Sequence, residues 1–591
     1  MSEQTFIPGK AKSLEESIAN LQQIAQEVGF QIEEGLKLNP VSGIHSLHIF
    51  EKTCPGVFTN GKGASEKATL ASALGEFLER LSTNYFFSDY WLERTPGDSA
   101  DNWLYYPDEK SFTKADFRQM LSPQLWRFYA DLSTSPGYER FKAENYEFAH
   151  FLSFNDHLDQ VRALPLRCVQ TDEVHYFPVN LLSNLYASNG LSAGNSALEA
   201  QIQSLSEVFE RWVKNRILRE NLCLPLVPDE VIARFPQVQK AIDALAEEGI
   251  YTEVRDASLG GKYPVMNVTL FDQKQGRCFA SFGAHPIFEV ALERTLTESL
   301  QGRHLRDLDG FQMPSFDDFA VAADENLENH FIDSSGLIHG RFISHQYDFS
   351  FKDWGFNGDF AAQWDYLCDL VTQEGAQVYV ANYRQFGFES CRILVPGMSE
   401  VYPRHELIEA NQNLGRELRD ALLAYPQEQD PLKIVELIED LGFSDHQGVA
   451  SLIGLMADKG SFWGNLNCLQ LKFWCQLKAQ VFEEAIESLL DIRYFIQTDS
   501  PWYPVYRAFE YALEMQLHTP EEGFSIEMSG MPSLFGKAIS EQVFEHLEGH
   551  SEFWQAPLGI EIFTQSKQHQ RLLDIYQNCR KFKSSHASVE H

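Results

Sequence analysis

Three segments of the chain carry glutamates and arginines at helical spacing. In chain order these residues are Glu76, Glu79 and Arg80, then Glu207, Glu210 and Arg211, then Arg294 and Glu298. The first two groups have the same internal spacing and lie 131 residues apart. Carboxylate oxygens are the ligands that Mg²⁺ prefers in proteins, and arginine binds phosphate oxygens through paired N–H groups. These residue types therefore predict a site in which magnesium ions hold phosphate groups.

The spacing places most of these side chains on single helical stripes. At about 100° per residue, residues three or four positions apart share one face of a helix. The stripe of the first predicted helix consists of Ser72, Glu76 and Glu79, and that of the second consists of Glu199, Gln203, Glu207 and Glu210. Apolar residues fall on the other faces, where they can anchor each helix in a core. Ser72 is therefore included among the candidate binding residues.

A structural reading of the same pattern remains open. Glutamate stripes are often solvated, and Glu–Arg pairs four residues apart stabilise helices without any ligand. An internal duplication could also preserve the spacing for folding alone. Glu199 has an alternative of its own, because with Ser196 it would form a capping box at the start of the second helix.

Two glycine turns precede the acidic helices. Gly63 and Gly194 each lie 13 residues before the first glutamate of the group that follows. Free backbone N–H groups at a helix start favour phosphate and other anions. Neither turn is a Walker A loop or a dinucleotide-binding glycine motif, so ordinary strand-to-helix turns are the alternative.

Lys10 and Ser17 form another candidate pair. Lys10 follows Pro8 and Gly9, and Ser13 with Glu16 predicts a capping box for the helix that carries Ser17. Lys10 and the first helical turn could therefore face one bound anion. The alternative is an exposed lysine and an ordinary helical serine.

Composition excludes several classes of protein. The chain has 591 residues, 44% of them hydrophobic, enough for two to four domains with sizeable cores. A formal net charge of −36 disfavours nucleic acid or an anionic membrane as the main partner, but leaves a basic protein partner open. Nine cysteines without a Cys-x-x-Cys pair indicate reduced, buried thiols. Without an apolar leader or spanning segment, the cytoplasm is the expected compartment.

The predicted elements divide the chain into two domains. Strand-like segments occur at 45–60, 160–187, 262–272, 277–283, 377–383 and 391–396, with long amphipathic helices between them. Residues 1–404 are therefore predicted to be one α+β domain, in which residues 90–160 are considered as an inserted module. Residues 405–591 show mainly helical periodicity and predict an all-α domain that resembles helical-repeat proteins. His285, in Gly-Ala-His-Pro, is expected to be a hydrogen-bonded structural histidine rather than a base.

These motifs together resemble the YcaO family. The segments that carry the resemblance are Phe-Ile-Pro-Gly-Lys10, Ala-Leu-Gly-Glu76-Phe-Leu-Glu79-Arg80, Ser192-Ala-Gly-Asn195, Glu207-Val-Phe-Glu210-Arg211 and Ala-Leu-Glu-Arg294-Thr-Leu-Thr-Glu298. The resemblance implies a mixed α+β ATP-binding fold without a P-loop, with Mg²⁺ between acidic helices and the phosphates. It implies metal ligation by Glu76, Glu79, Glu207, Glu210 and Glu298. It places Lys10, Ser17, Arg211 and Arg294 at the phosphates, and Ser192, Asn195 and Glu199 near the nucleoside.

The family resemblance also suggests several activities. Cyclodehydratases of the family use ATP to activate a peptide amide, but they tend to end in Pro-x-Pro-x-Pro, whereas this sequence ends in Ala-Ser-Val-Glu-His. A bacterial member is described as an accessory factor for β-methylthiolation of an aspartate in a small-subunit ribosomal protein, a reaction performed by a radical-SAM methylthiotransferase. We therefore expect an ATP-hydrolysing accessory protein that forms a homodimer. The alternatives are amide activation, a nucleotide-gated adaptor without catalysis, and an acidic scaffold without a nucleotide site.

Overall fold

The computed structural model describes residues 4–94, 103–130, 148–156, 159–306, 308–405, 407, 412–428, 430–518 and 525–586. The chain packs as two compact units. The first contains Met1–Ser88, Asp101–Asn411 and Gln577–His591, and the second contains Asp89–Ala100 and Gln412–Tyr576. The sequence predicts a boundary between residues 404 and 405, which differs from the limits of these two units. That residues 1–404 and 405–591 are separate domains stays a prediction.

Strands of the first unit form antiparallel sheets within the described ranges. One sheet has the order β1 (Ile32–Val41), β2 (Ile44–Glu51), β3 (Cys54–Gly63), and another has β10 (Arg277–Ala284), β9 (Val265–Asp272), β8 (Ile250–Asp256). The largest has the order β4 (Lys110–Thr113), β5 (Gln160–Cys168), β11 (Tyr379–Tyr383), β12 (Glu389–Leu394), β7 (Leu191–Gly194), and β6 (Val174–Pro178) pairs with β5. β3, β7 and β10 are therefore edge strands of three different sheets.

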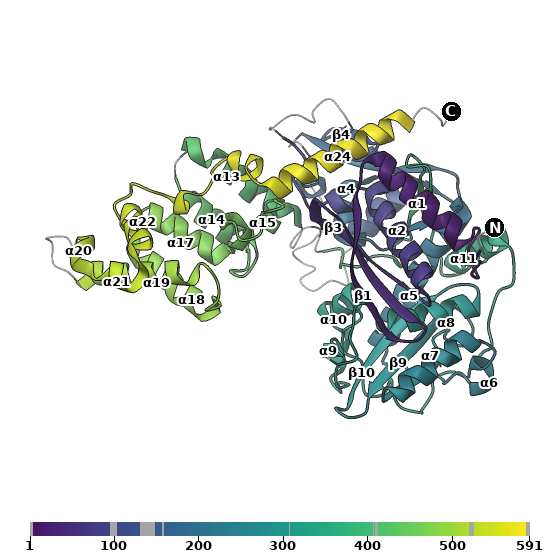
Figure 1. Cartoon of the computed structure of the whole chain (residues 1–591). Coiled ribbons are helices and arrows are strands. Elements are labelled where there is room, and N and C mark those ends of the chain that lie inside the picture. The colour runs from purple at the N-terminus through teal and green to yellow at the C-terminus, as the bar shows by residue number, and fades with distance from the viewer. Residues whose placement is uncertain are drawn as a thin grey trace. The chain divides into compact units, whose positions relative to one another are not determined.

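Helices cover these sheets (Figure 1). They are α1 (Leu14–Val28), α2 (Glu66–Ser82), α3 (Pro123–Ala130), α4 (Val179–Leu181), α5 (Ala197–Arg219), α6 (Asp229–Ile232), α7 (Pro236–Glu247), α8 (Phe288–Glu298), α9 (Asp318–Ala322), α10 (Asp324–Ile332) and α11 (Phe360–Gln373). The capping box predicted at the start of α1 is confirmed, since Ser13 and Glu16 exchange hydrogen bonds with each other's backbone N–H groups. The α+β fold class expected from the sequence is confirmed.

Alternation along β10 explains how the sheet of β8–β10 is buried on both faces. Ala280 and Phe282 belong to a hydrophobic cluster that also contains residues of α5 and α11. Phe279, the residue before Ala280, belongs to a second cluster with residues of α7 and α8. Successive strand residues point to opposite faces of a sheet, so the sheet separates two cores. Each buried aromatic or aliphatic side chain contributes about 2 kcal/mol to folding, which fixes α5 and α8 on this sheet.

The second unit is helical in its described parts. Its helices are α13 (Gly415–Glu428), α14 (Leu432–Asp440), α15 (Val449–Leu452), α16 (Phe462–Asn465), α17 (Cys468–Lys478), α18 (Phe482–Phe495), α19 (Tyr503–His518), α20 (Ile526–Ser529), α21 (Met531–Phe535), α22 (Lys537–Leu547) and α23 (Glu561–Thr564). Helix α24 (Lys567–His586) contributes residues to both units. Trp474 is buried at the centre of an aromatic core, where its ring lies 5.3 Å from that of Phe509 and its indole N–H donates to Tyr506. The helical prediction is confirmed, and the repeat architecture stays a prediction.

Two local expectations need correction or restriction. The strand-like segment 160–187 is strand only in part, because β6 ends at Pro178 and is followed by α4 and a π-helical turn over Leu182–Tyr186. The buried residues Leu181, Leu182 and Leu185 fit this helical geometry, with spacings of three and four as well as one. An inserted module is considered at residues 90–160. Its strand β4 pairs with β5 and so belongs to the largest sheet. Residues 95–102, 131–147 and 157–158 of this segment lie outside the described residues.

Candidate functional site

The predicted glutamates lie on the helices of three strand–helix motifs, β3–α2, β7–α5 and β10–α8. Figure 1 labels the three helices, α2, α5 and α8. The first two motifs share one turn geometry. Ser65 and Ser196 cap their helices with φ −146°, ψ 160° and φ −145°, ψ 161°. A Cβ added at Gly63 or Gly194 would lie 2.8 Å or less from a backbone nitrogen in the first turn of the following helix. The repeat in the sequence is therefore also a repeat in the structure.

The three motifs pack in a closed ring. Each helix packs on its own strand and also on the edge strand of another motif: α2 on β7, α5 on β10 and α8 on β3. The helices with the predicted metal ligands are consequently neighbours, although they are far apart in the sequence. Gly283, near the end of β10, lies against Thr295 of α8, so the third motif also has a glycine at the strand–helix contact.

Glu76 and Glu79 of α2 share one arginine. Arg80 donates to Glu76 at 3.2 Å and lies 3.3 Å from Glu79. Burial raises the pKa of Glu79 to about 8, even though the charge of Arg80 lowers it. Glu76 and then Glu207 of α5 raise this pKa further, so the carboxylates of α2 and α5 are close enough to repel one another.

Arg211 plays the corresponding role on α5. Its guanidinium lies 3.1 Å from Glu207 and 4.3 Å from the ring centre of Phe331 on α10. One of its nitrogens, Nη1, is buried and has no hydrogen-bond acceptor within the described residues. An N–H group left in this state costs about 1–3 kcal/mol, so it favours binding of an anion with a free oxygen.

Glu210 and Glu298 form a second group between α5 and α8. Burial raises the pKa of Glu210 to about 7, and the charge of Glu298 adds to this. Lys214, one turn after Glu210, is buried and donates to the backbone carbonyl of His330 at 2.7 Å. Burial lowers the pKa of Lys214 to about 8, against the opposing effect of Glu210. Lys62 of β3 forms an ion pair with Glu298 and thereby joins β3 to α8.

Arg294 links α8 to α5 directly. Its Nη1 donates to the side-chain carbonyl of Gln203, one turn before Glu207. Its Nε is buried without a hydrogen-bond acceptor in the described part of the chain. Arg294 therefore resembles Arg211 in keeping one N–H group available for an additional acceptor.

The N-terminal candidates gather around Glu199. Its carboxylate lies 3.2 Å from Nζ of Lys10 and accepts from the backbone N–H of Ala11 at 2.9 Å. Asn195 donates to the same carboxylate at 3.2 Å and accepts from the hydroxyl of Ser17 at 2.8 Å. Lys10, Ser17, Asn195 and Glu199 thus form one hydrogen-bonded cluster, although up to 189 positions separate them in the sequence.

This cluster bears on the capping box predicted for Glu199, whose role in binding stays a prediction. The Ser196 side chain accepts from the backbone N–H of Glu199 at 3.2 Å, as a helix cap should. The carboxylate of Glu199 is 3% exposed and is directed to Lys10 and Ala11. Only half of the predicted capping box is therefore observed, and its other half is replaced by contacts with the N-terminal turn.

The two remaining candidates have partners in the fold. Ser72 accepts from the backbone N–H of Lys62 at 3.4 Å, next to the ion pair with Glu298. Ser192 is buried, and its hydroxyl donates to the carbonyl of Ala200 and lies 3.5 Å from Sγ of Cys391. Ser192 thus holds β7 against α5. Its assignment to the nucleoside stays a prediction.

His285 also lies beside the N-terminal turn. Its Nδ1 accepts from the backbone N–H of Ile287 at 3.0 Å, which confirms the hydrogen-bonded role expected for it. A Cβ added at Gly9 would lie 3.3 Å from Nε2 of His285. Burial lowers the pKa of His285 to about 3, and the nearby charges of Arg294 and Lys10 lower it further. The imidazole is therefore neutral and supports the turn that carries Lys10.

The residues fit Mg²⁺ and phosphate in chemistry, with one restriction. Buried carboxylates with raised pKa values gain from a bound cation. Buried N–H groups of Arg80, Arg211 and Arg294 have no acceptor among the described residues and suit phosphate oxygens. Within the described ranges, however, no three His, Cys, Asp or Glu side chains lie close enough together to hold one metal ion. Each ion would therefore need phosphate or water oxygens as well, which is the usual situation for Mg²⁺.

Reasoning from the sequence missed two lysines of the site. Lys62 lies in Gly61-Lys62-Gly63 at the end of β3, where the sequence predicts an anion-binding turn that would act through its backbone. Lys214 follows Glu210 by four residues and therefore continues the polar stripe of α5. Both signals were present in the sequence, but only the packing of β3 and α5 against α8 gives the lysines their acidic neighbours.

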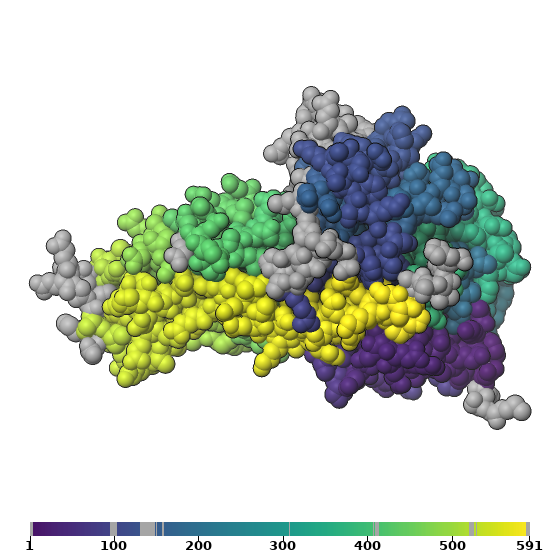
Figure 2. Space-filling model, turned by 90° about the horizontal axis from the view of Figure 1, so that it is seen from above, coloured from purple at the N-terminus to yellow at the C-terminus, as the bar shows by residue number. Residues whose placement is uncertain are grey.

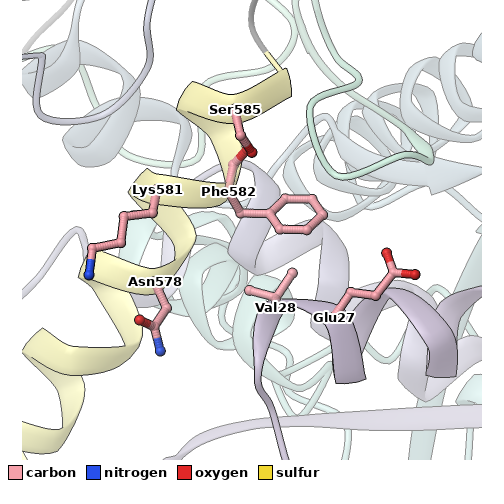
Figure 3. Close-up of a pocket in the computed structure, with 6 residues that line it drawn as sticks. All are labelled: Glu27, Val28, Asn578, Lys581, Phe582 and Ser585. Atoms are coloured by element: carbon pink, nitrogen blue, oxygen red, sulfur yellow. The ribbon is translucent and has the colours of Figure 1, made fainter.

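An open hollow of about 370 Å³ lies between α1 and the C-terminal part of α24. Figure 2 shows these segments, purple and yellow, lying against each other, and in Figure 3 Phe582 points from α24 toward Val28 and Glu27 of α1. Asn578, Lys581 and Ser585 complete the lining. None of these residues belongs to the predicted site, so the hollow and the glutamate groups are separate features.

Two family models match the chain. Residues 60–399 match the YcaO cyclodehydratase family, described as ATP- and Mg²⁺-binding, and residues 415–585 match the YcaO cyclodehydratase C-terminal domain. The chain belongs to the YcaO family. The family predicted from the motifs is confirmed, and so are the two ligands, ATP and Mg²⁺, that the family implies. Which residues hold these ligands stays a prediction.

The chain is also similar to individual proteins. It is 44% identical over 491 residues, 82% of each chain, to the ribosomal protein S12 methylthiotransferase accessory factor YcaO of Escherichia coli K12. It is 41% identical over 99% of each chain to an uncharacterised protein of Haemophilus influenzae. A solved structure of YcaO from Methanopyrus kandleri with AMPPCP and Mg²⁺ aligns with 70% of this chain and 98% of its own, at 19% identity and a TM-score of 0.38. None of the described helices is long and apolar enough to cross a membrane.

Proposed function

We propose that the chain is a Mg²⁺-dependent ATPase that acts as an accessory factor in β-methylthiolation of an aspartate of a small-subunit ribosomal protein. One observation carries the ATPase part: glutamates of α2, α5 and α8 lie in two electrostatically coupled groups, next to arginines with buried N–H groups that lack acceptors. The accessory role is supported by the 44% identity to a relative with that name.

The residues would divide the work as follows. Glu76, Glu79, Glu207, Glu210 and Glu298 would hold Mg²⁺, which neutralises phosphate charge when it is bound. Arg211 and Arg294 would donate their free N–H groups to phosphate oxygens. Lys10, Ser17, Asn195 and Glu199 would hold the rest of the nucleotide through the cluster at the start of α5, with Ser72 and Ser192 beside it. Positioning and charge neutralisation are the main contributions that phosphoryl transfer requires of a protein.

The accessory role implies partners. A radical-SAM methylthiotransferase and the ribosomal protein are the partners that we infer from the relative's name. Homodimer formation or partner docking is assigned to the helical second unit. All nine cysteines are free thiols, as expected for a protein that acts in the reducing cytoplasm.

A second function follows from the description of the family as a cyclodehydratase. The same site could use ATP to activate a peptide amide for attack by a side chain or by sulfide. This function predicts a modified peptide as a product in addition to ADP or AMP. An adaptor without catalysis predicts neither product, only nucleotide-dependent association with a partner.

The test compares Glu76→Ala and Glu207→Ala with the unchanged chain in ATP hydrolysis with Mg²⁺. Loss of one essential charge contact should lower turnover by about a hundredfold or more, with an unchanged circular dichroism spectrum. Glu220→Gln is the matched control, because Glu220 ends α5 in an exposed pair with Arg216 at 2.8 Å. Normal turnover in both alanine variants would reject the site. ATP binding without turnover in the unchanged chain would favour the adaptor.

The accessory role needs a separate measurement. Mass spectrometry of the ribosomal protein, isolated from cells that carry each variant, reports the modification of its aspartate. Glu76→Ala should abolish the methylthio group if ATP turnover drives the reaction. Full modification in cells without this chain would reject the accessory role and leave the ATPase assignment intact.

A further inference from the structure

Large apolar side chains are exposed around α9 and α10. Met313, Phe316 and Phe319 lie within seven residues of one another and are 71%, 82% and 88% exposed. Ile332, at the end of α10, is 65% exposed, and α10 packs on α9 (Figure 1). Single exposed apolar residues are common, but several in one short segment and in the helix that packs on it mark a surface that binds something. These four residues are called the α9–α10 surface.

The backbone holds this surface in place. Ser315 donates to the carbonyl of Ile338 at 2.9 Å and accepts from the backbone N–H of Gly340 at 2.7 Å. The ring of Phe316 rests edge-on against His339, with 5.6 Å between ring centres. Asp317 caps α9 by accepting from two backbone N–H groups. Backbone hydrogen bonds and a helix cap therefore hold the segment that carries Phe316 and Phe319 in place.

The negative charge of the segment between Arg306 and Arg341 indicates the kind of partner that it can bind. Between Arg306 and Arg341 the sequence contains eight Asp or Glu residues and no Lys or Arg. Some of these acids are paired, as Asp324 is with Arg219 at 2.9 Å. Asp317 and Glu325 are exposed and form no ion pair within the described residues. Aromatic rings in the same short segment as carboxylates without an ion pair suit a basic segment that also carries apolar side chains.

The surface is connected to the candidate ATP site through α10. Phe331 lies against the guanidinium of Arg211 at 4.3 Å, and the carbonyl of His330 accepts from Lys214 at 2.7 Å. Ile332 is the next residue of the same helix. A partner bound at the surface would therefore contact the helix that holds the cations beside Glu207 and Glu210.

We propose that the α9–α10 surface docks a basic, apolar-anchored segment of the protein on which the ATP site acts. This inference rests on the proposed function, which requires a protein acceptor. An anionic membrane or nucleic acid would be repelled by the acidic residues. A twofold interface between two copies of the chain would place this surface against itself, and the same acids would then oppose one another.

The experiment measures binding of a short fluorescein-labelled peptide with interspersed lysine, arginine, leucine and phenylalanine residues to the full chain by fluorescence anisotropy. Two comparison peptides replace either the basic residues by glutamate or the apolar residues by serine. The basic apolar peptide should bind, and both comparison peptides should bind at least about tenfold more weakly. Equal binding of all three peptides would overturn the proposal.

Variants locate the binding on the chain. Phe316→Ser with Phe319→Ser should weaken peptide binding by about tenfold or more, and Asp317→Asn with Glu325→Gln should weaken it and reduce its dependence on salt. Phe319→Ser alone is the variant least expected to disturb folding, because Phe319 is the most exposed of the four residues. Leu36→Ser with Phe58→Ser is the matched control, since these residues are exposed on the sheet of β1–β3. Unchanged binding in the phenylalanine variants would overturn the proposal.

Two further readouts separate the alternatives. Sedimentation mass should be the same for the unchanged chain and for Phe316→Ser with Phe319→Ser, and a change from dimer to monomer would instead make the surface a contact between copies. Basal ATP hydrolysis should also be unchanged in these variants. If the chain binds the peptide at this surface but does not hydrolyse ATP, the proposed ATPase fails while the docking surface stands.

Discussion

Lys62 of β3 is ion-paired with Glu298 of α8, so an ammonium group lies on a carboxylate predicted to bind magnesium. The pair connects two elements that are 236 residues apart in the sequence. Magnesium at Glu298 must compete with this ammonium. If Glu298 is a metal ligand, as proposed, the ion pair would lower the affinity of the site for magnesium, in addition to holding β3 against α8.

Lys62→Met should strengthen Mg²⁺ binding. A charge-assisted hydrogen bond is worth about 1.5–3 kcal/mol, so its removal should raise affinity by roughly ten- to hundredfold. Isothermal titration of the chain with MgCl₂ measures this directly. Lys52→Met is the control, because it removes an exposed ion pair with Glu33, at 2.7 Å, from the same sheet. Unchanged or weaker binding in Lys62→Met would show that the ammonium does not compete with the metal.

Glu199→Gln should weaken ATP binding without unfolding the helix that carries it. The substitution leaves Lys10 without its anionic partner and weakens the hydrogen bond from Ala11. A hydrogen bond to a charged group is worth about 2 kcal/mol, and losing the contacts that hold Lys10 should therefore lower ATP affinity by roughly thirtyfold. Titration calorimetry with ATP and Mg²⁺ gives the dissociation constant.

The control for this prediction is Glu16→Gln. Glu16 completes the capping box of α1 but makes no hydrogen bond or ion pair with Lys10 or Asn195 in the described structure. It should therefore change helix stability slightly and leave ATP affinity within a factor of about two. Equal losses in both variants would mean that Glu199 acts only through the fold.

Local patterns in the sequence predict local structure well in this chain. The repeated spacing around Glu76 and Glu207 predicts equivalent turns, and the caps Ser65 and Ser196 have nearly the same backbone angles. Helix caps, strand alternation and glycine contacts depend on neighbours within a few residues. A short segment of the sequence is therefore enough to predict them. The stretch after Pro178 was misjudged because apolar residues without a clear period fit a strand or a buried helix equally.

Contacts between distant segments could not be predicted in the same way. Nothing near Glu199 in the sequence indicates that its carboxylate faces Ala11, 188 residues away. The closed ring of three strand–helix motifs arises from packing of three separate sheets, and it alone brings Lys62 to Glu298. The grouping of the glutamates could be predicted only as a hypothesis from residue types, and its division into two groups depends on side-chain packing.

Acid should destabilise the first unit through His330. Burial lowers the pKa of His330 to about 4, and the charge of Lys214 lowers it further. The folded chain keeps this imidazole neutral, whereas the unfolded chain binds a proton below pH 6.5 or so. The stability that it contributes is therefore present above that pH and is lost as pH falls toward about 4. At pH 5 the loss should be about 2 kcal/mol.

His330→Gln should remove this part of the acid sensitivity. The free energy of unfolding, measured in urea at pH 8 and pH 5, should fall by about 2 kcal/mol less in the variant than in the unchanged chain. His345→Gln, the same substitution at an exposed histidine, is the matched control. The same pH dependence in His330→Gln as in the unchanged chain would assign the acid sensitivity to other groups.

Alanine at Gly194 should destabilise the fold, whereas alanine at Gly75 should stabilise it. A Cβ at Gly194 would lie 2.6 Å from the backbone nitrogen of Ala200, and backbone cannot move aside as a side chain can. The cost should be about 1–3 kcal/mol. Gly75, inside α2, has nothing within 4 Å of an added Cβ, so alanine there should add about 0.5–1 kcal/mol through helix propensity. Urea unfolding of both variants measures the difference, and a tolerated alanine at Gly194 would show that the turn shared by the two motifs does not depend on this close approach.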